Sequence, residues 1–158
     1  MKKTLFFVIS LVMCFTMCKK DETCPTGFEG DNCNSEIRVK FYGTYLGTLT
    51  GGGQSEASQS TLTEFAGDVE KITWDQDAYL KISGSTTFDI PDQQVQASGN
   101  TITLEGNGSL DGNKITMDFK ASMSGVTVDF NFVGTKQKAG SVSGSSLILD
   151  DVVEIISE

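Results

Sequence analysis

The chain of 158 residues contains no histidine, only two prolines and one tryptophan, and far fewer basic than acidic side chains. Without histidine, the Ser-His-Asp and Cys-His catalytic arrangements and every histidine-containing metal site are excluded. The 12 Lys and Arg stand against 21 Asp and Glu, which gives a net charge of −9. Nucleic-acid binding requires a basic surface, so we expect no nucleic-acid partner.

Glycine is abundant, with 17 residues in the chain, and serine and threonine are frequent. A glycine share well above the average of about 7% favours an all-β chain with many turns. The length suits one domain with one hydrophobic core, and 38% hydrophobic residues are enough to fill it.

An export signal is predicted over residues 1–17. Lys2 and Lys3 precede an apolar stretch over 5–17, which as a helix would reach about 20 Å, short of the ~30 Å hydrocarbon core of a membrane. A short apolar run behind basic residues is typical of a signal peptide. Its removal takes two lysines and no acid from a net charge of −9, which leaves −11.

Cys18 closes the apolar run and is followed directly by polar residues. This segment resembles a bacterial lipoprotein signal, in which the cysteine is lipidated and becomes the mature N-terminus; an ordinary secretory signal is the alternative. Lys20, Asp21 and Glu22 resemble the surface-export signal of Bacteroidota lipoproteins, with a solvated charge run as the alternative. The resemblance implies an outer-membrane protein that is held by N-terminal acyl chains and faces the cell exterior. Acyl chains provide such an anchor without a basic patch.

A disulfide is predicted between Cys24 and Cys33. Pro25 and two glycines lie between them and favour turns that bring the ends together, and export permits the bond. Two cysteines without a third ligand make a poor metal site. The spacing Cys-x-x-Gly-Phe-x-Gly-x-x-Cys resembles the last loop of an EGF-like module. We interpret 18–35 as a lipidated linker with a disulfide-stapled hook, without the calcium or receptor function of complete EGF-like modules.

A β domain is predicted over 36–158, where apolar and polar residues alternate and turn signals recur. Three consecutive antiparallel strands are expected at 101–110, 113–121 and 125–134, with a tight turn at Asp111-Gly112. Further half-buried strands are expected around Trp74, Leu80 and Phe88. In total we expect eight to ten short strands in an antiparallel up-and-down barrel, with a β-sandwich or jelly roll as the alternative.

Two segments lack clear alternation. Residues 51–60 are polar and rich in glycine and serine, which predicts a loop. At the C-terminus, Leu149, Val152, Val153 and Ile156 fall at helical spacing, but the β-branched content of 152–156 favours a strand. Residues 134–146 would then form a loose connection.

Residues 41–45 and 132–137 resemble the ends of the lipocalin-like (calycin) domains of Bacteroidota lipoproteins. In those domains a Gly-x-Trp-like opening strand and a closing basic residue flank a small up-and-down barrel. Here Tyr45 stands in place of the tryptophan, and the hairpin at 108–116 has the same style. The resemblance implies a lipocalin-like barrel over 36–158.

Carboxylates are the remaining candidates for catalysis, and they occur as the pairs Asp75 and Asp77, and Asp150 and Asp151. Glycosidase chemistry needs one of two acids buried with a raised pKa. We expect the first pair on a turn after Trp74, where carboxylates stay solvated. A weak Ca²⁺ site is the alternative there, without the full twelve-residue loop pattern. We therefore expect no enzyme, no cofactor and no metal.

Non-catalytic binding is the function that remains. A barrel of about eight strands either fills with side chains or holds one small ligand. The first hypothesis is a small apolar ligand inside the barrel, lined by large inward residues: Tyr45, Trp74, Phe88, Met117, Phe119 and Phe130.

The alternative is a filled core in a module that binds a surface glycan or a protein, or that is purely structural in the envelope. Exposed aromatic residues such as Tyr42, Trp74 or Tyr79 would then stack on sugar rings. Residues 146–153 resemble the final strand of jelly-roll carbohydrate-binding domains. An enclosed apolar cavity of at least ~300 Å³ favours the internal ligand, whereas a filled barrel favours the glycan or protein binder.

Overall fold

The computed structural model describes residues 24–75, 78–138 and 147–157. The predicted signal peptide, Cys18, the export residues Lys20, Asp21 and Glu22, and Asp77 lie outside the described residues. The predictions made for them are therefore taken up again only as proposals.

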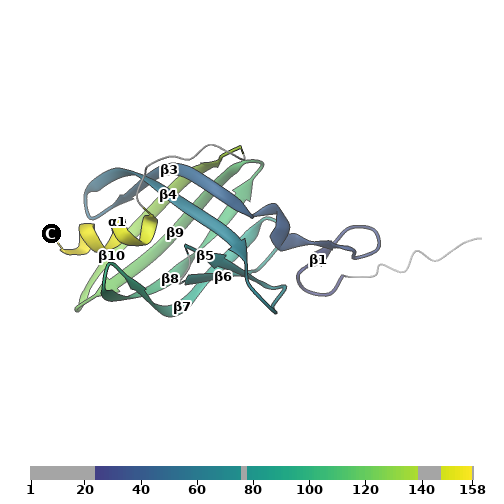
Figure 1. The fold of residues 1–158 in the computed structure, drawn as a ribbon, viewed down its shortest axis with the longest axis horizontal. Helices are drawn as coiled ribbons and strands as arrows, with labels where there is room; N and C mark the ends of the chain where they lie inside the picture. Colours follow the sequence, from purple (N-terminus) through teal and green to yellow (C-terminus); the bar gives the residue numbers. More distant parts are fainter. Residues whose placement is uncertain (1–23, 76–77, 139–146, 158) are drawn as a thin grey trace, which may run out of the picture.

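Eight strands form a closed antiparallel barrel in which each strand pairs with the next in the chain and the last pairs with the first (Figure 1). They are β3 (Gly43–Gly51), β4 (Gln54–Glu64), β5 (Lys71–Trp74), β6 (Ala78–Ile82), β7 (Thr87–Ala97), β8 (Asn100–Asp111), β9 (Lys114–Met123) and β10 (Val126–Lys136). This is the predicted up-and-down barrel, and the sandwich or jelly-roll alternative is wrong.

The three strands predicted with the clearest alternation are confirmed as β8, β9 and β10, within two residues at each end. Gly112 has a φ of +58° in the turn between β8 and β9, a conformation that glycine adopts without strain. β10 continues to Lys136, so the connection predicted to start at residue 134 starts later. Residues 139–146 of that connection are outside the described ranges.

Strand β4 corrects the prediction of a loop over 51–60, because only the turn at 52–53 separates β3 from β4. Ser58 and Ser60 occupy inward positions of β4 and are 1% and 0% exposed. Small polar residues thus stand where a half-buried strand normally has apolar ones. The alternation that marks a strand is therefore missing from the sequence of β4.

The C-terminal segment forms a helix, α1 (Ile148–Ser157), where a strand over 152–156 was predicted. The residues at helical spacing are buried on one face, and this tertiary burial outweighs the strand preference of β-branched side chains. The same helix removes the predicted jelly-roll strand at 146–153. In the part of the chain that the structure describes, no helix has the length and apolar character needed to cross a membrane.

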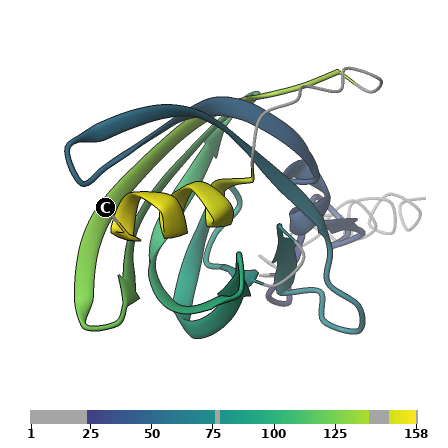
Figure 2. The ribbon, with the colours of Figure 1, turned by 60° about the vertical axis from the view of Figure 1, so that its left-hand side comes forward.

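Helix α1 lies across one end of the barrel, which we call the mouth. It contacts β4, β7, β9 and β10, strands that come from different sides of the barrel. Figure 2 shows the helix in yellow across this opening, and Figure 1 shows the N-terminal hook at the opposite end. The two ends of the barrel are therefore closed by different parts of the chain.

The hook consists of β1 (Phe28–Glu29), β2 (Ser35–Glu36) and a 3-10 helix, η2 (Ile37–Lys40). The two short strands pair with each other in antiparallel fashion. The predicted disulfide between Cys24 and Cys33 is confirmed, with Cα atoms 5.2 Å apart. Closing such a loop removes conformational freedom from the unfolded chain, worth about 2–3 kcal/mol.

Arg38 joins the hook to the barrel, and its side chain is buried with 5% exposure. Its guanidinium donates to the carboxylate of Glu36 at 2.8 Å and to that of Glu64 at 3.1 Å. It also donates to the carbonyl oxygens of Phe65 and Asp68, both at 2.9 Å. Four acceptors on two sides of one planar cation hold the hook against the connection between β4 and β5.

The residues that carry the lipocalin-like resemblance pack together at the hook end. The ammonium of Lys136 lies 5.7 Å from the ring centroid of Tyr45 and donates to the carbonyl of Lys40 at 2.8 Å. The Tyr45 hydroxyl donates to the carbonyl of Phe41 at 2.7 Å. Tyr45 on β3 and Lys136 on β10 thus hold the first and last strands of the barrel together.

Aromatic rings fill the barrel by lying over inward-facing glycines. A Cβ atom at Gly51 would collide with the ring of Phe130, and one at Gly108 would collide with the ring of Phe88. The absence of a side chain at these positions lets large rings pack flat against the wall, which brings the interior toward close packing.

Candidate functional site

The six residues predicted to line an internal ligand site all belong to the hydrophobic core and are at most 3% exposed: Tyr45, Trp74, Phe88, Met117, Phe119 and Phe130. Trp74 meets Phe119 edge to face, and Phe119 stacks on Phe130, with centroids 5.5 Å apart in both pairs. Phe88 packs against Phe41 at 5.6 Å. Three of the six residues, Trp74, Phe119 and Phe130, therefore contact one another as rings.

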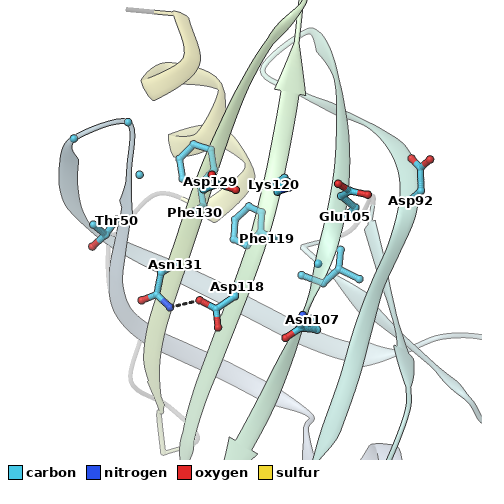
Figure 3. A pocket seen from close by; sticks show the side chains of 15 residues that line it. Thr50, Asp92, Glu105, Asn107, Asp118, Phe119, Lys120, Asp129, Phe130 and Asn131 are labelled. Carbon is cyan, nitrogen blue, oxygen red and sulfur yellow. Dashed lines mark hydrogen bonds between the residues drawn. The ribbon is translucent and has the colours of Figure 1, made fainter.

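A groove of about 790 Å³ lies on the outer wall of the barrel, across β3, β10, β9, β8 and β7 (Figure 3). Its polar lining comes from outward-facing positions, most of which are exposed. The strand register arranges these side chains in two rows, which we call the distal ladder, nearer the mouth, and the proximal ladder, nearer the hook.

The distal ladder consists of Asp129, Lys120 and Glu105, which are direct cross-strand partners on β10, β9 and β8. The proximal ladder consists of Asn131, Asp118 and Asn107 on the same strands, and Thr50 of β3 extends it. The two ladders are two residues apart along each strand, about 7 Å. An extended ligand that crosses the strands could contact both.

Between the two ladders lies a row of inward-facing residues. This row is formed by Gly51, Phe130, Phe119 and Gly106, which are register partners. The two phenylalanines are 3% exposed and belong to the core, and the two glycines have no side chain. The floor between the two ladders is therefore formed by backbone atoms.

Charge in the groove is mainly negative, since Asp92, Glu105, Asp118 and Asp129 line it together with one cation, Lys120. Asn131 donates to a carboxylate oxygen of Asp118 at 2.7 Å, as Figure 3 shows. Among the described residues, no ion pair joins Lys120 to its neighbours in the ladder. The groove thus offers carboxylate and amide acceptors with amide and ammonium donors.

Alternation within the strand predicted at 125–134 places Thr127, Asp129 and Asn131 on its water-facing side, but it does not identify the groove. Alternation along one strand fixes which face a residue occupies. The lateral neighbours depend on the register between strands, and Asp118 lies 13 positions from its partner Asn131. The sequence signal that could have pointed to the groove is the presence of outward-facing Asp and Asn residues on two consecutive predicted strands, 113–121 and 125–134.

Asp75 is buried with 5% exposure, which corrects the prediction of a solvated carboxylate. One of its oxygens accepts from the backbone N–H of Thr61 at 2.6 Å. Desolvation raises the pKa of Asp75 to about 7, and the negative charges of Asp150 and Asp151 act in the same direction. The described residues include no group of three or more acidic or cysteine side chains placed to hold a metal.

The aromatic residues proposed for sugar stacking lie away from the groove. Trp74 is fully buried, which corrects its placement on the surface. Tyr42 and Tyr79 are half-buried, and Tyr79 packs against Phe65 with the ammonium of Lys71 over its ring at 5.1 Å. A row of exposed rings is therefore not formed by these three residues.

Comparisons with known proteins give one structural likeness to report. No family model and no curated protein matches the chain. A solved structure from Bacteroides fragilis, provisionally described as an outer membrane protein, aligns with a TM-score of 0.43 and 12% identity. The alignment covers 63% of this chain and 52% of the other, so the chain spans about half the length of that protein.

Proposed function

We propose that this chain is an outer-membrane lipoprotein anchored by acyl chains on Cys18 and displayed on the cell exterior through the signal Lys20, Asp21 and Glu22. The sequence pattern around Cys18 supports the anchor, and a net charge of −11 after removal of 1–17 gives no attraction to an anionic membrane surface. Cys18 precedes the hook in the chain, and the mouth lies at the opposite end of the barrel (Figure 1). An anchor there leaves the distal half of the barrel facing away from the membrane.

The barrel is a non-catalytic binding module, and its binding surface is the groove on the outer wall. One observation carries this proposal: the groove of about 790 Å³ lies between two polar ladders outside the barrel, whereas three of the six residues predicted to line an internal site, Trp74, Phe119 and Phe130, contact one another. An internal apolar ligand would need the space that these rings and α1 occupy. We therefore favour the external ligand of the two hypotheses.

The ligand class that fits the groove is a surface glycan of neutral or amino sugars. Carboxylates accept hydrogen bonds from sugar hydroxyl groups, and side-chain amides both accept and donate them. The ladders repeat these groups across several strands. Four carboxylates against one lysine repel uronates and sulfated sugars. The charge of the groove therefore favours neutral and amino sugars over acidic sugars.

The test is binding of the full chain to an array of neutral, amino-sugar and uronate oligosaccharides. We expect binding to neutral or amino sugars and none to uronates. The double substitution Asp118→Ala and Asn131→Ala removes the bonded pair of the proximal ladder. A hydrogen bond to a charged group is worth about 1.5–3 kcal/mol, so affinity should fall roughly 10- to 100-fold.

The matched control is Asp111→Ala, which removes an exposed aspartate from the last position of β8 at the hook end. Its affinity should equal that of the wild type. Glycan binding that survives the double substitution would contradict the groove as the binding surface.

A further inference from the structure

Strand β9 places a donor and an acceptor on the two sides of the groove. Lys120 belongs to the distal ladder and Asp118 to the proximal ladder, and both side chains are exposed in the groove (Figure 3). Phe119, between them in the chain, belongs to the core and is 3% exposed. Because alternate residues of a strand face the same side about 7 Å apart, a ligand in the groove lies between an ammonium and a carboxylate.

The ammonium of Lys120 has no partner in the part of the chain that the structure describes. Its register partners, Asp129 on β10 and Glu105 on β8, both carry carboxylates. Neither carboxylate forms an ion pair with Lys120, and its side chain has no other polar contact. A lysine offers three N–H donors, so all three are free for a ligand.

The carboxylate of Asp118 is held in place and still able to accept. One of its oxygens accepts a hydrogen bond from the side-chain amide of Asn131 at 2.7 Å. A carboxylate has about four lone-pair sites on its two oxygens. Asn131 therefore orients Asp118 and leaves it free to accept a further hydrogen bond from a ligand.

A secondary amide matches this pair of groups. The amide is planar and trans, so its N–H and its C=O point in opposite directions, and one amide group can donate to Asp118 while it accepts from Lys120. The amide nitrogen and oxygen are about 2.3 Å apart and each hydrogen bond adds about 2.9 Å, which gives about 8 Å from the carboxylate to the ammonium. The spacing between the two side chains along β9 is about 7 Å, and the long stem of lysine takes up the difference.

The other groups of neutral and amino sugars match the pair less well. A hydroxyl group also donates and accepts, but both bonds end on one oxygen atom, so the hydroxyl spans only about 5 Å. A protonated amino group donates to Asp118, but it has no acceptor for Lys120 and is repelled by its charge. An acetamido group alone uses both sides of the groove without adding a charge.

We propose that the groove selects N-acetylated amino sugars, with the acetamido group bridging Asp118 and Lys120. This inference rests on the proposed glycan-binding function and names the sugar that the groove prefers. Lys120 then determines specificity, because it is the only cation among the described residues that line the groove.

Calorimetric titration of the full chain with three β-1,4-linked trisaccharides tests the proposal: those of N-acetylglucosamine, of glucosamine and of glucose. The acetylated sugar should bind roughly tenfold more tightly than the glucose sugar, because a charge-assisted hydrogen bond is lost with the acetamido group. Equal affinity for these two would overturn the proposal. Tightest binding of the glucosamine sugar would also overturn it, since attraction to the carboxylates would then decide the preference.

Three variants locate the preference. Lys120→Met keeps the apolar stem without the donors, so affinity for the acetylated sugar should fall roughly tenfold, to the level of the glucose sugar. Lys120→Arg retains N–H donors and should keep the preference. Lys114→Met removes an exposed lysine of β9 outside the groove and should bind as the wild type. A preference that survives in Lys120→Met would overturn the proposal.

Failure of this inference and failure of the proposed function give different results. If no neutral or amino sugar on the array binds, the glycan-binding function fails and the inference fails with it. If sugars bind and the Asp118 and Asn131 double variant weakens them, but the acetylated trisaccharide has no advantage, only the inference fails.

Discussion

The joint at the hook end and the wall formed by β4 and β5 differ in how well they satisfy their buried polar groups. At the hook end, Arg38 satisfies four acceptors and Lys136 binds a carbonyl above the Tyr45 ring, and the Tyr42 hydroxyl is the exception without a partner. Along β4 and at the end of β5, polar atoms of four residues are buried without a hydrogen-bond partner among the described residues: Ser58, Ser60, Trp74 and Asp75. A polar atom buried without a partner costs stability, so the hook joint is the better satisfied of the two regions.

The largest expected effect concerns the anchor that precedes the hook. In Cys18→Ser the chain loses the acceptor of its acyl chains, so the protein should leave the membrane fraction of the cells completely. Fractionation followed by immunoblotting measures this. Cys14→Ser, in the same predicted signal peptide, is the control and should leave the protein in the membrane. Membrane retention of Cys18→Ser would mean that the hook end is not the anchored one.

The next effect concerns Asp75 at the end of β5. A carboxylate whose pKa is raised to about 7 by burial contributes stability that is complete below its unfolded value near ~4 and lost as the pH rises through 7. Asp75→Asn should therefore be more stable than the wild type at pH 8, by up to about 4 kcal/mol, and gain nothing at pH 4. Urea unfolding at both pH values measures this. Equal stability of the two proteins at pH 8 would remove the contrast between the hook joint and the β4–β5 wall.

The hook end should give a smaller effect that does not depend on pH. Arg38→Met keeps much of the apolar stem but leaves two carbonyls and two carboxylates without their donor. Because Glu64 is largely exposed, we expect a loss of about 2–3 kcal/mol rather than the full value of a buried pair. Urea unfolding at pH 5 and pH 8 checks both the size and the independence from pH. A loss below about 1 kcal/mol would show that the joint depends little on Arg38.

The same contrast explains what the sequence could predict. Strand β9 was predictable because Ile115, Met117 and Phe119 alternate with polar residues, and the disulfide because Cys24 and Cys33 flank their own turns. Strand β4 was missed because its inward positions hold serines. Helix α1 was missed because its β-branched residues are held helical by burial in the mouth, a contact that lies outside any local pattern.

The candidate site depends even more on contacts between distant segments. The ladders follow from the register of β8, β9 and β10. The raised pKa of Asp75 depends in part on the charges of Asp150 and Asp151, on a helix that begins 73 residues later in the chain. Alternation gave the correct face for Asp129 and Asn131 but could not give their neighbours. The face on which a residue lies can be predicted from the alternation along its own strand. The residues that lie beside it on neighbouring strands can be identified only once the fold is known.

The most direct test of the proposed binding surface is a map of backbone amide shifts by NMR, as the full chain is titrated with a neutral oligosaccharide that it binds on the array. The groove predicts shifts concentrated at outward positions such as Asn107, Asp118 and Lys120, with the core around Trp74 unchanged. Shifts concentrated at Trp74 and along α1, with the ladders unchanged, would place the ligand inside the barrel and contradict the account.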